Sequence, residues 1–244
     1  MDLELRRAVP ADFTALRAIA AAGGSPDGDD RYFAFVGSIG TLMVATVDRL
    51  VVGFAGVVPV RGSAMVSDLF VDPAHRAHGV GRRLLRSVLD DHASRLTFSS
   101  THPAALRLYA EFGMVADERL VTMDGVAVGG SAPLMPGSWQ HDRPEVIDHF
   151  RRSGAVITNH SVVRVGVGDV EVWRVDGHEP ERALSDVIAA GAPGDRISLS
   201  MLESHPLVSW LQRQGFHETD HDIWCRTPSV TRTTMVSCVH RGLG

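Results

Sequence analysis

The chain has 244 residues, of which 44% are hydrophobic and 22% charged, and its formal net charge is −5. This length and composition are ordinary for a globular protein with one large or two small domains, and no apolar run approaches the roughly 18 residues that a membrane-spanning helix needs. The negative charge balance argues against nucleic acid as a partner and is compatible with a cationic amine as a substrate.

Residue types and motifs that the sequence lacks exclude further classes of chemistry. All 24 residues counted as Lys and Arg are arginines, which excludes lysine chemistry such as a Schiff-base cofactor. Two cysteines are too few for a disulfide framework, and no His-Glu-x-x-His or Cys-x-x-Cys string occurs, so we expect no metal site. The N-terminus has no hydrophobic segment of the secretory type, so we expect a cytoplasmic protein.

The first half is predicted to alternate strands and helices in a mixed α/β (α+β) order. After a strand at 5–9, Asp12 is expected to cap a helix with Phe13, Leu16 and Ile19 on its buried side. A loop containing Asp27, Asp29 and Asp30 follows; it is either a solvated loop or an attractor for a cationic amine. The remaining expected elements are a helix at 31–36, a hairpin of strands 41–47 and 51–58, a strand at 64–71, a helix whose buried stripe includes Leu84 and Leu85, a strand at 95–99, a helix at 104–112 and a strand at 115–123.

The most informative stretch runs from Leu69 to Leu85, where a buried strand turns through Gly79 and Gly81 into a helix. A helix start exposes unpaired backbone N–H groups and the positive end of the helix dipole, and glycines let a ligand approach the main chain. Three arginines, Arg76, Arg82 and Arg83, add positive charge there. The stretch therefore predicts a phosphate-binding turn. A dinucleotide-binding turn would need a third glycine and a suitably placed acid, and a P-loop would need a lysine.

The pattern Arg-x-x-Gly-x-Gly at 76–81 resembles the acetyl-coenzyme A loop of the GNAT acetyltransferase superfamily, and Leu-Phe-Val-Asp-Pro at 69–73 is similar to that family's central strand. The resemblance covers about residues 1–124 and implies a GNAT fold, with a mixed sheet splayed between the strands at 64–71 and 95–99. The pantetheine arm of acetyl-coenzyme A would enter this splay. The cofactor-binding residues so implied are Leu69, Phe70, Val71, Arg76, Ala77, His78, Gly79, Val80, Gly81, Arg82 and His102.

The resemblance also assigns candidate catalytic residues. Tyr109 matches the family tyrosine four residues before the helix-ending glycine, which donates a proton to the departing thiolate; the alternative is a core aromatic. The acceptor amine must lose a proton, and Asp68 is the candidate base, with Ser67 as a water-holder on the opposite face. A solvated Asp68 is the alternative. His102 stands where the family often has asparagine, and it is either a helix cap or a secondary base.

The second half repeats part of the first. Residues 196–200 and 204–216 echo residues 95–99 and 101–114, including a Ser/Thr-His-Pro start to a helix. Where the glycine pair should stand, Glu179-Pro180-Glu181 puts two negative charges and removes a donor. We therefore predict a catalytic GNAT domain at 1–124, a linker at 125–140 and a degenerate GNAT-like domain at 141–244.

Together these observations predict an acetyl-coenzyme A-dependent N-acetyltransferase, in which a primary amine of a small molecule or peptide attacks the thioester directly in a ternary complex. The alternative is a non-catalytic acyl-coenzyme A-binding sensor or interaction protein. No nucleic acid, membrane or metal is expected, and an oligomer is possible. The acceptor pocket is expected to be built by the variable loop at 23–40, with the second domain as a further candidate, so the identity of the acceptor is not readable from the sequence.

Overall fold

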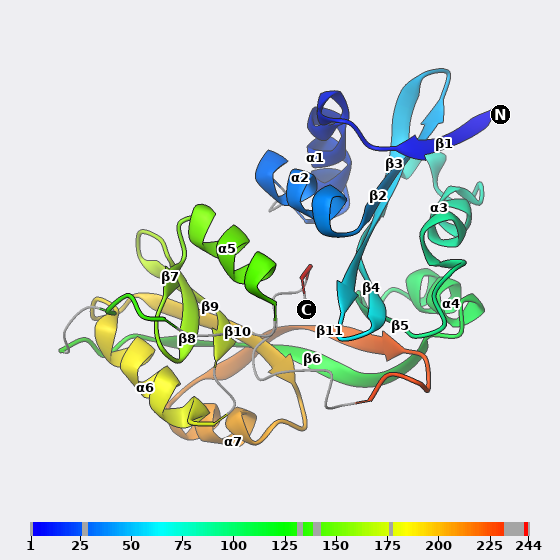
Figure 1. Cartoon of the computed structure of the whole chain (residues 1–244). Coiled ribbons are helices and arrows are strands. Elements are labelled where there is room, and N and C mark those ends of the chain that lie inside the picture. Colours follow the sequence, from blue (N-terminus) through cyan, green and yellow to red (C-terminus); the bar gives the residue numbers. More distant parts are fainter. Residues whose placement is uncertain are drawn as a thin grey trace.

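The computed structural model describes residues 2–25, 29–130, 134–138, 143–175, 178–231 and 242–243. It contains a single mixed sheet of eleven strands that runs through both halves of the chain, with helices on both faces (Figure 1). The strands are β1 (Leu3–Arg7), β2 (Thr41–Val47), β3 (Leu50–Val60), β4 (Ser63–Val71), β5 (Arg95–Ser99), β6 (Val115–Val126), β7 (Val156–Ile157), β8 (Ser161–Val165), β9 (Asp169–Val175), β10 (Arg196–Leu202) and β11 (His217–Arg226).

The helices form two layers, as the alternation of buried side chains in the strands requires. They are α1 (Phe13–Ala22), α2 (Asp30–Ile39), α3 (Val80–Leu89), α4 (Pro103–Glu111), α5 (Pro144–Arg152), α6 (Pro180–Ala190) and α7 (Pro206–Arg213). Buried side chains of α1, α2 and α5 share one core cluster with Trp224 of β11. The next residue, Cys225, points to the other face and joins the cluster that includes α3 residues and Tyr109 of α4, because successive strand side chains alternate.

The strand order shows that the two halves exchange their last strands. The sheet reads β1-β2-β3-β4-β5-β11-β6-β10-β9-β8-β7, so β11 lies between β5 and β6, and β6 pairs with β10 of the second half. The core is shared as well, since Phe150 of α5 belongs to the same cluster as Phe33 of α2. The linker at 125–140 between two domains stays a prediction. Strands and core residues from both sides of this segment pack together.

The second half repeats the architecture of the first. Strands β9 and β10 are parallel neighbours, as β4 and β5 are, and a helix follows each pair. The helices α4 and α7 even begin alike: the Nδ1 atoms of His102 and His205 accept hydrogen bonds from the amides of Ala104 and Leu207, each at 3.2 Å. Helix α6 starts at Pro180 with Glu179 as its N-cap, where α3 has Gly79.

The expected splay between β4 and β5 is present. Only Ala64, Met65 and Val66 of β4 lie opposite β5 residues, the last pair being Val66 with Thr97. From Asp68 to Val71, β4 keeps β3 as its partner but has no β5 partner. The register of β4 against β3 shifts at this point, with Val66 opposite Val57 but Asp68 opposite Gly56, so Ser67 is the extra residue of a β-bulge.

Most elements lie where the periodicity places them, but the expected cap of α1 is wrong. The Asp12 carboxylate makes no bond to the first turn of α1. Instead it accepts hydrogen bonds from the Val9 amide at 2.8 Å and from the Arg6 guanidinium at 2.7 and 2.8 Å. A short 3-10 turn, Pro10–Asp12, precedes the helix, so Asp12 closes that turn rather than the helix.

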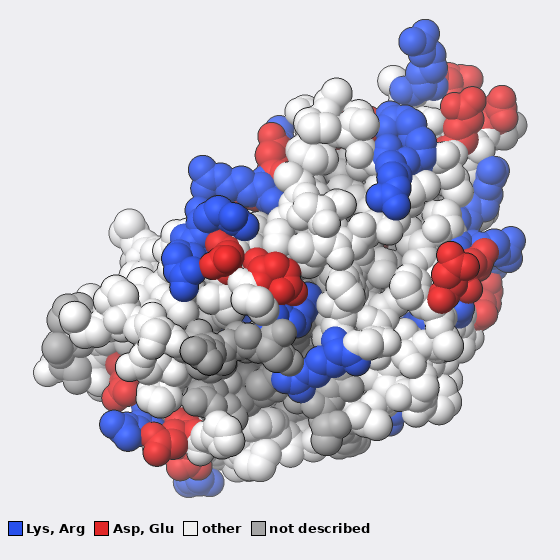
Figure 2. Space-filling model, viewed as in Figure 1, with Lys and Arg blue, Asp and Glu red and all other residues white. Residues whose placement is uncertain are grey.

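On the face drawn in Figure 2, charged side chains of both signs lie among each other. Figure 2 shows arginines interspersed with acidic residues on the face that carries α2 and α5. Among the described helices, none is long and apolar enough to cross a bilayer.

Candidate functional site

The turn from β4 into α3 has the backbone shape of an anion-binding loop. Ala77 and Gly79 adopt left-handed conformations with φ of 64° and 77°, and Gly79 is the N-cap of α3. The amide of Arg83 makes the first bond of the helix, to the Gly79 carbonyl at 3.1 Å. The amides of Val80, Gly81 and Arg82 precede that bond and belong to the unpaired first turn of the helix, where the positive end of its dipole lies.

The arginines of this turn are tied to the protein itself. Arg76 Nε donates to the Val71 carbonyl at 3.1 Å, and Arg82 forms a two-point ion pair with Glu111 at 2.6 and 2.7 Å. Arg83 donates to the Leu3 carbonyl at 2.8 Å. Glu111 offsets the charge of Arg82, whereas Arg76 and Arg83 keep their charges while bonded to main-chain carbonyls, so the expected role of these arginines toward a ligand stays a prediction.

The two glycines have different structural roles. A Cβ added at Gly79 would meet no atom within 4 Å, so open space lies beside this residue. A Cβ added at Gly81 would lie 3.4 Å from a methyl carbon of Leu108 on α4. Gly79 therefore supplies the left-handed backbone with open space beside it, whereas a Cβ at Gly81 would make an ordinary van der Waals contact with α4.

Tyr109 lies at the point where β4 leaves β5. Its side chain projects from α4 into the core and is buried. Burial raises the pKa of Tyr109 above its usual value, the Thr97 hydroxyl opposes the shift as a hydrogen-bonding neighbour, and the charges of Asp68 and Asp222 add to it. Thr97 is the last β5 residue opposite β4, and its hydroxyl donates to the Val66 carbonyl at 3.0 Å. The Tyr109 phenol therefore keeps its proton throughout the physiological pH range.

Asp68 lies on the α2 side of the same opening. Its Oδ2 accepts hydrogen bonds from the Tyr32 hydroxyl and the Ser67 hydroxyl, both at 2.8 Å. Burial raises the pKa of Asp68 to about 6, although both hydrogen bonds oppose the shift. A carboxylate with this pKa is ionised at neutral pH and is a stronger base than an exposed aspartate.

The expected place of Ser67 on the opposite face from Asp68 is wrong. Regular alternation would separate the two side chains, but the β-bulge at Ser67 breaks the alternation and brings both hydroxyl and carboxylate to the same side. Bulges are common beside functional sites because they redirect side chains.

The chain's C-terminal residues pack close to this carboxylate. A Cβ added at Gly242 would collide with the Tyr32 hydroxyl oxygen, and the Leu243 carbonyl accepts a hydrogen bond from Arg143, which precedes α5. Leu243 is fully buried in the core that α1, α2 and α5 share. Residues of both halves therefore surround the α2 side of the opening.

The remaining predicted site residues have structural partners. His102 is exposed and caps α4, which supports the cap among its two candidate roles. Asp29 caps α2 by accepting from the Tyr32 amide at 2.7 Å, and Asp30 forms an ion pair with Arg17. Asp27 lies outside the described residues. In the described part of the chain, His, Cys, Asp and Glu side chains do not gather in groups of three that could hold a metal ion.

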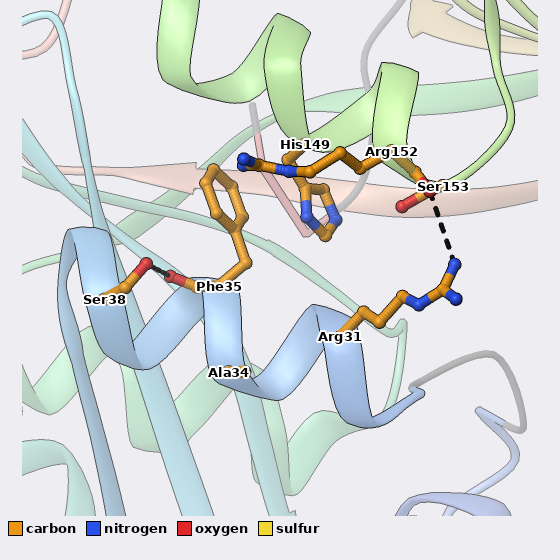
Figure 3. A pocket seen from close by; sticks show the side chains of 7 residues that line it. All are labelled: Arg31, Ala34, Phe35, Ser38, His149, Arg152 and Ser153. Atoms are coloured by element: carbon orange, nitrogen blue, oxygen red, sulfur yellow. Dashed lines mark hydrogen bonds between the residues drawn. The ribbon is translucent and has the colours of Figure 1, made fainter.

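A cavity of about 550 Å³ lies elsewhere, between α2 and α5 (Figure 3). Arg31 reaches across it to donate to the Arg152 carbonyl at 3.3 Å, and His149 stacks on Phe35 with ring centroids 4.1 Å apart. The other lining residues are Ala34, Ser38 and Ser153. None of the site residues predicted from the sequence lines this cavity, and its hydrogen bond joins the two halves at the end of α5.

Sequence reasoning missed Tyr32 and Thr97. The chain has two tyrosines in all, and both stand at this opening, so their scarcity was a usable signal for Tyr32. Thr97 has no such signal, because its role depends on the parallel register of β5 with β4.

Comparisons with known proteins agree with this geometry. A family model described as an acetyltransferase (GNAT) domain matches residues 38–114. A mycothiol acetyltransferase of Saccharomonospora viridis is 46% identical over 77 residues, which is 30% of this chain and 24% of that protein. The corresponding protein of Amycolatopsis mediterranei is 34% identical over 99 residues, covering 38% of this chain and 33% of that protein. The match thus spans a third or less of these relatives.

Solved structures match over almost the whole chain. A putative acetyltransferase from Pyrococcus horikoshii superposes with a TM-score of 0.74 at 16% identity, covering 99% of this chain and 96% of that one. A tandem GNAT protein from the clavulanic acid biosynthesis pathway has a TM-score of 0.64 at 13% identity, covering 93% and 98%. At these identities the likeness establishes the fold. Residues 38–114 therefore match the GNAT acetyltransferase domain model, and the chain as a whole has the fold of these two solved structures.

Proposed function

We propose that this protein is an N-acetyltransferase that moves an acetyl group from acetyl-coenzyme A to a primary amine by direct attack in a ternary complex. One observation carries the proposal: the buried phenol of Tyr109 and the raised-pKa carboxylate of Asp68 both lie at the opening between β4 and β5. A hydrogen-bond donor and a base at the same opening are what a thioester and an attacking amine require.

The donor side of this proposal rests on the loop and on the strand edge. Residues 67–71 of β4 face the opening without a β5 partner, so their backbone groups suit an extended pantetheine arm. The amides at 80–82 and the left-handed Gly79 suit its diphosphate. We propose contacts from Leu69, Phe70, Val71, Arg76, Ala77, His78, Gly79, Val80, Gly81, Arg82 and His102, mainly through main-chain atoms. Acetyl-coenzyme A would supply the acetyl group as a thioester.

On the acceptor side, Asp68 takes the proton that the amine loses as the new C–N bond forms. Breaking the C–S bond leaves a thiolate, whose conjugate acid has a pKa near ~8.5. Because the Tyr109 pKa is raised, its hydroxyl stays protonated and stabilises the thiolate as a hydrogen-bond donor. The thiolate then takes a proton from solvent, and Asp68 releases its own.

The relatives named above are mycothiol acetyltransferases, but the matched stretches cover 30% and 38% of this chain. Assigning their acceptor to this protein would depend on residues that lie outside the matched stretches. We therefore propose the acceptor only as a primary amine of a small molecule or peptide.

The experiment combines calorimetry with a thiol-release assay. We expect acetyl-coenzyme A to bind and at least one amine in a panel of amines, amino acids and peptides to release free thiol. Tyr109→Phe should lower kcat by about 10²-fold while the Kd for acetyl-coenzyme A changes less than about 3-fold, because only the developing charge loses its donor.

Phe112, which is the C-cap residue of the same helix and packs against the same core, offers a matched control. Phe112→Leu removes part of an aromatic side chain without removing a hydroxyl, so kcat should stay within about 3-fold of the parent. Binding without thiol release for every amine would instead support a sensor, and no heat with acetyl-coenzyme A would overturn the proposal.

A further inference from the structure

The cavity between α2 and α5 lies apart from the opening between β4 and β5. Its volume of about 550 Å³ suits a small organic molecule. The α2 residues that line it lie three or four positions apart and so share one side of the helix: Arg31, Ala34, Phe35 and Ser38. Tyr32 stands on another side of α2, where its hydroxyl donates to Asp68. The proposed acetyl transfer therefore does not use this cavity.

The wall of the cavity is positively charged. Among the described residues that line it, Arg31 and Arg152 are cationic and none is acidic. Two acidic residues near these arginines in the sequence pair with other arginines: Asp30 with Arg17, and Asp148 with Arg151. Within the described part of the chain, the guanidinium groups of Arg31 and Arg152 form no ion pair. The wall can therefore bind negative charge on a ligand.

The two guanidinium groups point in different directions along the cavity (Figure 3). Arg31 reaches toward the end of α5, where it donates to the Arg152 carbonyl at 3.3 Å. The Arg152 side chain extends the other way, toward the ring of Phe35. A guanidinium has five N–H donors, so one bond leaves Arg31 with donors for an anion. A ligand that meets both arginines must carry negative charge at two separate points.

His149 adds a buried polar group to the same wall. The residue is 8% exposed, and its ring stacks on Phe35 with an angle of 9° between the planes. Its imidazole nitrogens have no hydrogen-bond partner among the described residues, and a buried polar group without a partner is costly. Burial lowers the pKa of His149, the charge of Asp29 opposes the shift, and that of Arg152 adds to it. The neutral ring offers one N–H donor to a ligand.

We propose that this cavity binds a small dicarboxylate, with one carboxylate at Arg31 and the other at Arg152. The apolar chain between the carboxylates lies against Ala34 and Phe35, and His149 donates a hydrogen bond to the ligand. Because α2 belongs to the first half of the chain and α5 to the second, the bound dicarboxylate connects the two halves. This site is independent of the proposed acetyl transfer.

The test is calorimetry of the full chain at constant ionic strength with succinate, glutarate and adipate. Each is compared with the monocarboxylate of equal carbon number, namely butanoate, pentanoate and hexanoate. We expect at least one dicarboxylate to bind with a Kd below about 1 mM, and at least about 10-fold more tightly than its monocarboxylate, because it meets two guanidinium groups instead of one.

Substitutions in the wall locate the binding. Arg31→Gln and Arg152→Gln should each raise the Kd of that dicarboxylate by about 10-fold, to the level of the monocarboxylate. Arg151→Gln is the matched control, because Arg151 is the exposed neighbour of Arg152 and does not line the cavity. It removes an equal charge and should change the Kd by less than about 2-fold.

Ala34→Leu checks the place of binding without changing charge. Ala34 is exposed and lines the cavity, so the larger side chain should fill part of it and raise the Kd by about 10-fold while the chain stays folded. No heat with any dicarboxylate, or equally tight binding of the matching monocarboxylate, would overturn the inference. So would an unchanged Kd in both Arg31→Gln and Arg152→Gln, or an equal loss in Arg151→Gln. Should a glutamine variant not fold, the ligand series and Ala34→Leu still decide.

Discussion

At the scale of single residues, the environment of Asp68 predicts how the activity depends on pH. The carboxyl is flanked by Ser67 on its own strand and by Tyr32 from α2, and its charge acts at longer range on Tyr109 from α4. Burial outweighs the two hydrogen bonds and sets the pKa at about 6. Below this pH the group is protonated and accepts no proton from an amine.

We therefore expect kcat/KM to fall about tenfold per pH unit below about pH 6 and to flatten above it, apart from ionisation of the amine itself. Asp68→Asn should lower kcat/KM by about 10²-fold at pH 7.5 and remove the break near pH 6. A pH series of the thiol-release assay with a single amine measures both. A break that persists in Asp68→Asn would assign the titration to another group.

At this scale the sequence predicted the candidate catalytic residues but not the relation between two neighbouring side chains. Tyr109 and Asp68 were predicted from a resemblance, and the structure places both at one opening. The relation of Ser67 to Asp68 was predicted wrongly because a bulge depends on pairing with the partner strand. The sequence of β4 alone contains no pattern that predicts it. Thr97 was not predicted at all, since its place depends on the parallel register of β5 with β4.

At the scale of elements, the turn into α3 shows how local sequence determines local structure. Gly79 ends the turn in a left-handed conformation that other residues adopt only with strain, and the helix begins at the next residue. The hairpin, the helix stripes and the strands of the first half were likewise predictable, because each depends on residues that are neighbours in the chain.

Gly79→Ala tests the turn. The added methyl should cost about 1 kcal/mol of unfolding free energy through backbone strain. Its Cβ would enter the open space beside the loop, so we expect the Kd for acetyl-coenzyme A to rise by about 5-fold or more. Thermal unfolding and calorimetry give the two numbers.

Gly62 provides a matched control in the turn between β3 and β4. Its φ is 79°, against 77° for Gly79, and a Cβ there would also meet no atom within 4 Å. Gly62→Ala should lose similar stability and leave the Kd unchanged. Equal effects of the two substitutions on binding would show that the loop does not touch the ligand.

At the scale of the whole molecule, the shared sheet links the stability of the two halves. The sequence repeat predicts two similar units, and their similar β4–β5 and β9–β10 pairs agree with it. What the repeat does not reveal is that β6 and β11 change places, because either strand satisfies the local pattern in either position. Only the packing of both halves together decides between them.

A chain ended after Phe216 therefore should not fold, because β5 and β6 lose their common neighbour and Trp224 leaves the core. Soluble expression and circular dichroism test this. A chain ended after Thr231 keeps β11 and loses the buried Leu243, so it should remain folded with stability lower by roughly 3 kcal/mol. Cooperative unfolding of the chain ended after Phe216 would contradict the interdependence of the two halves.

The position of β11 has a consequence for biosynthesis. Strands β5 and β6 leave the ribosome long before β11, and until it emerges they have no neighbour between them. Nascent chains gain structure from the N-terminus onward, so a growing polypeptide passes through a stage with two open strand edges. Strand β11 is complete only when translation has passed Arg226, so the stage before that point is the one most in need of chaperone protection.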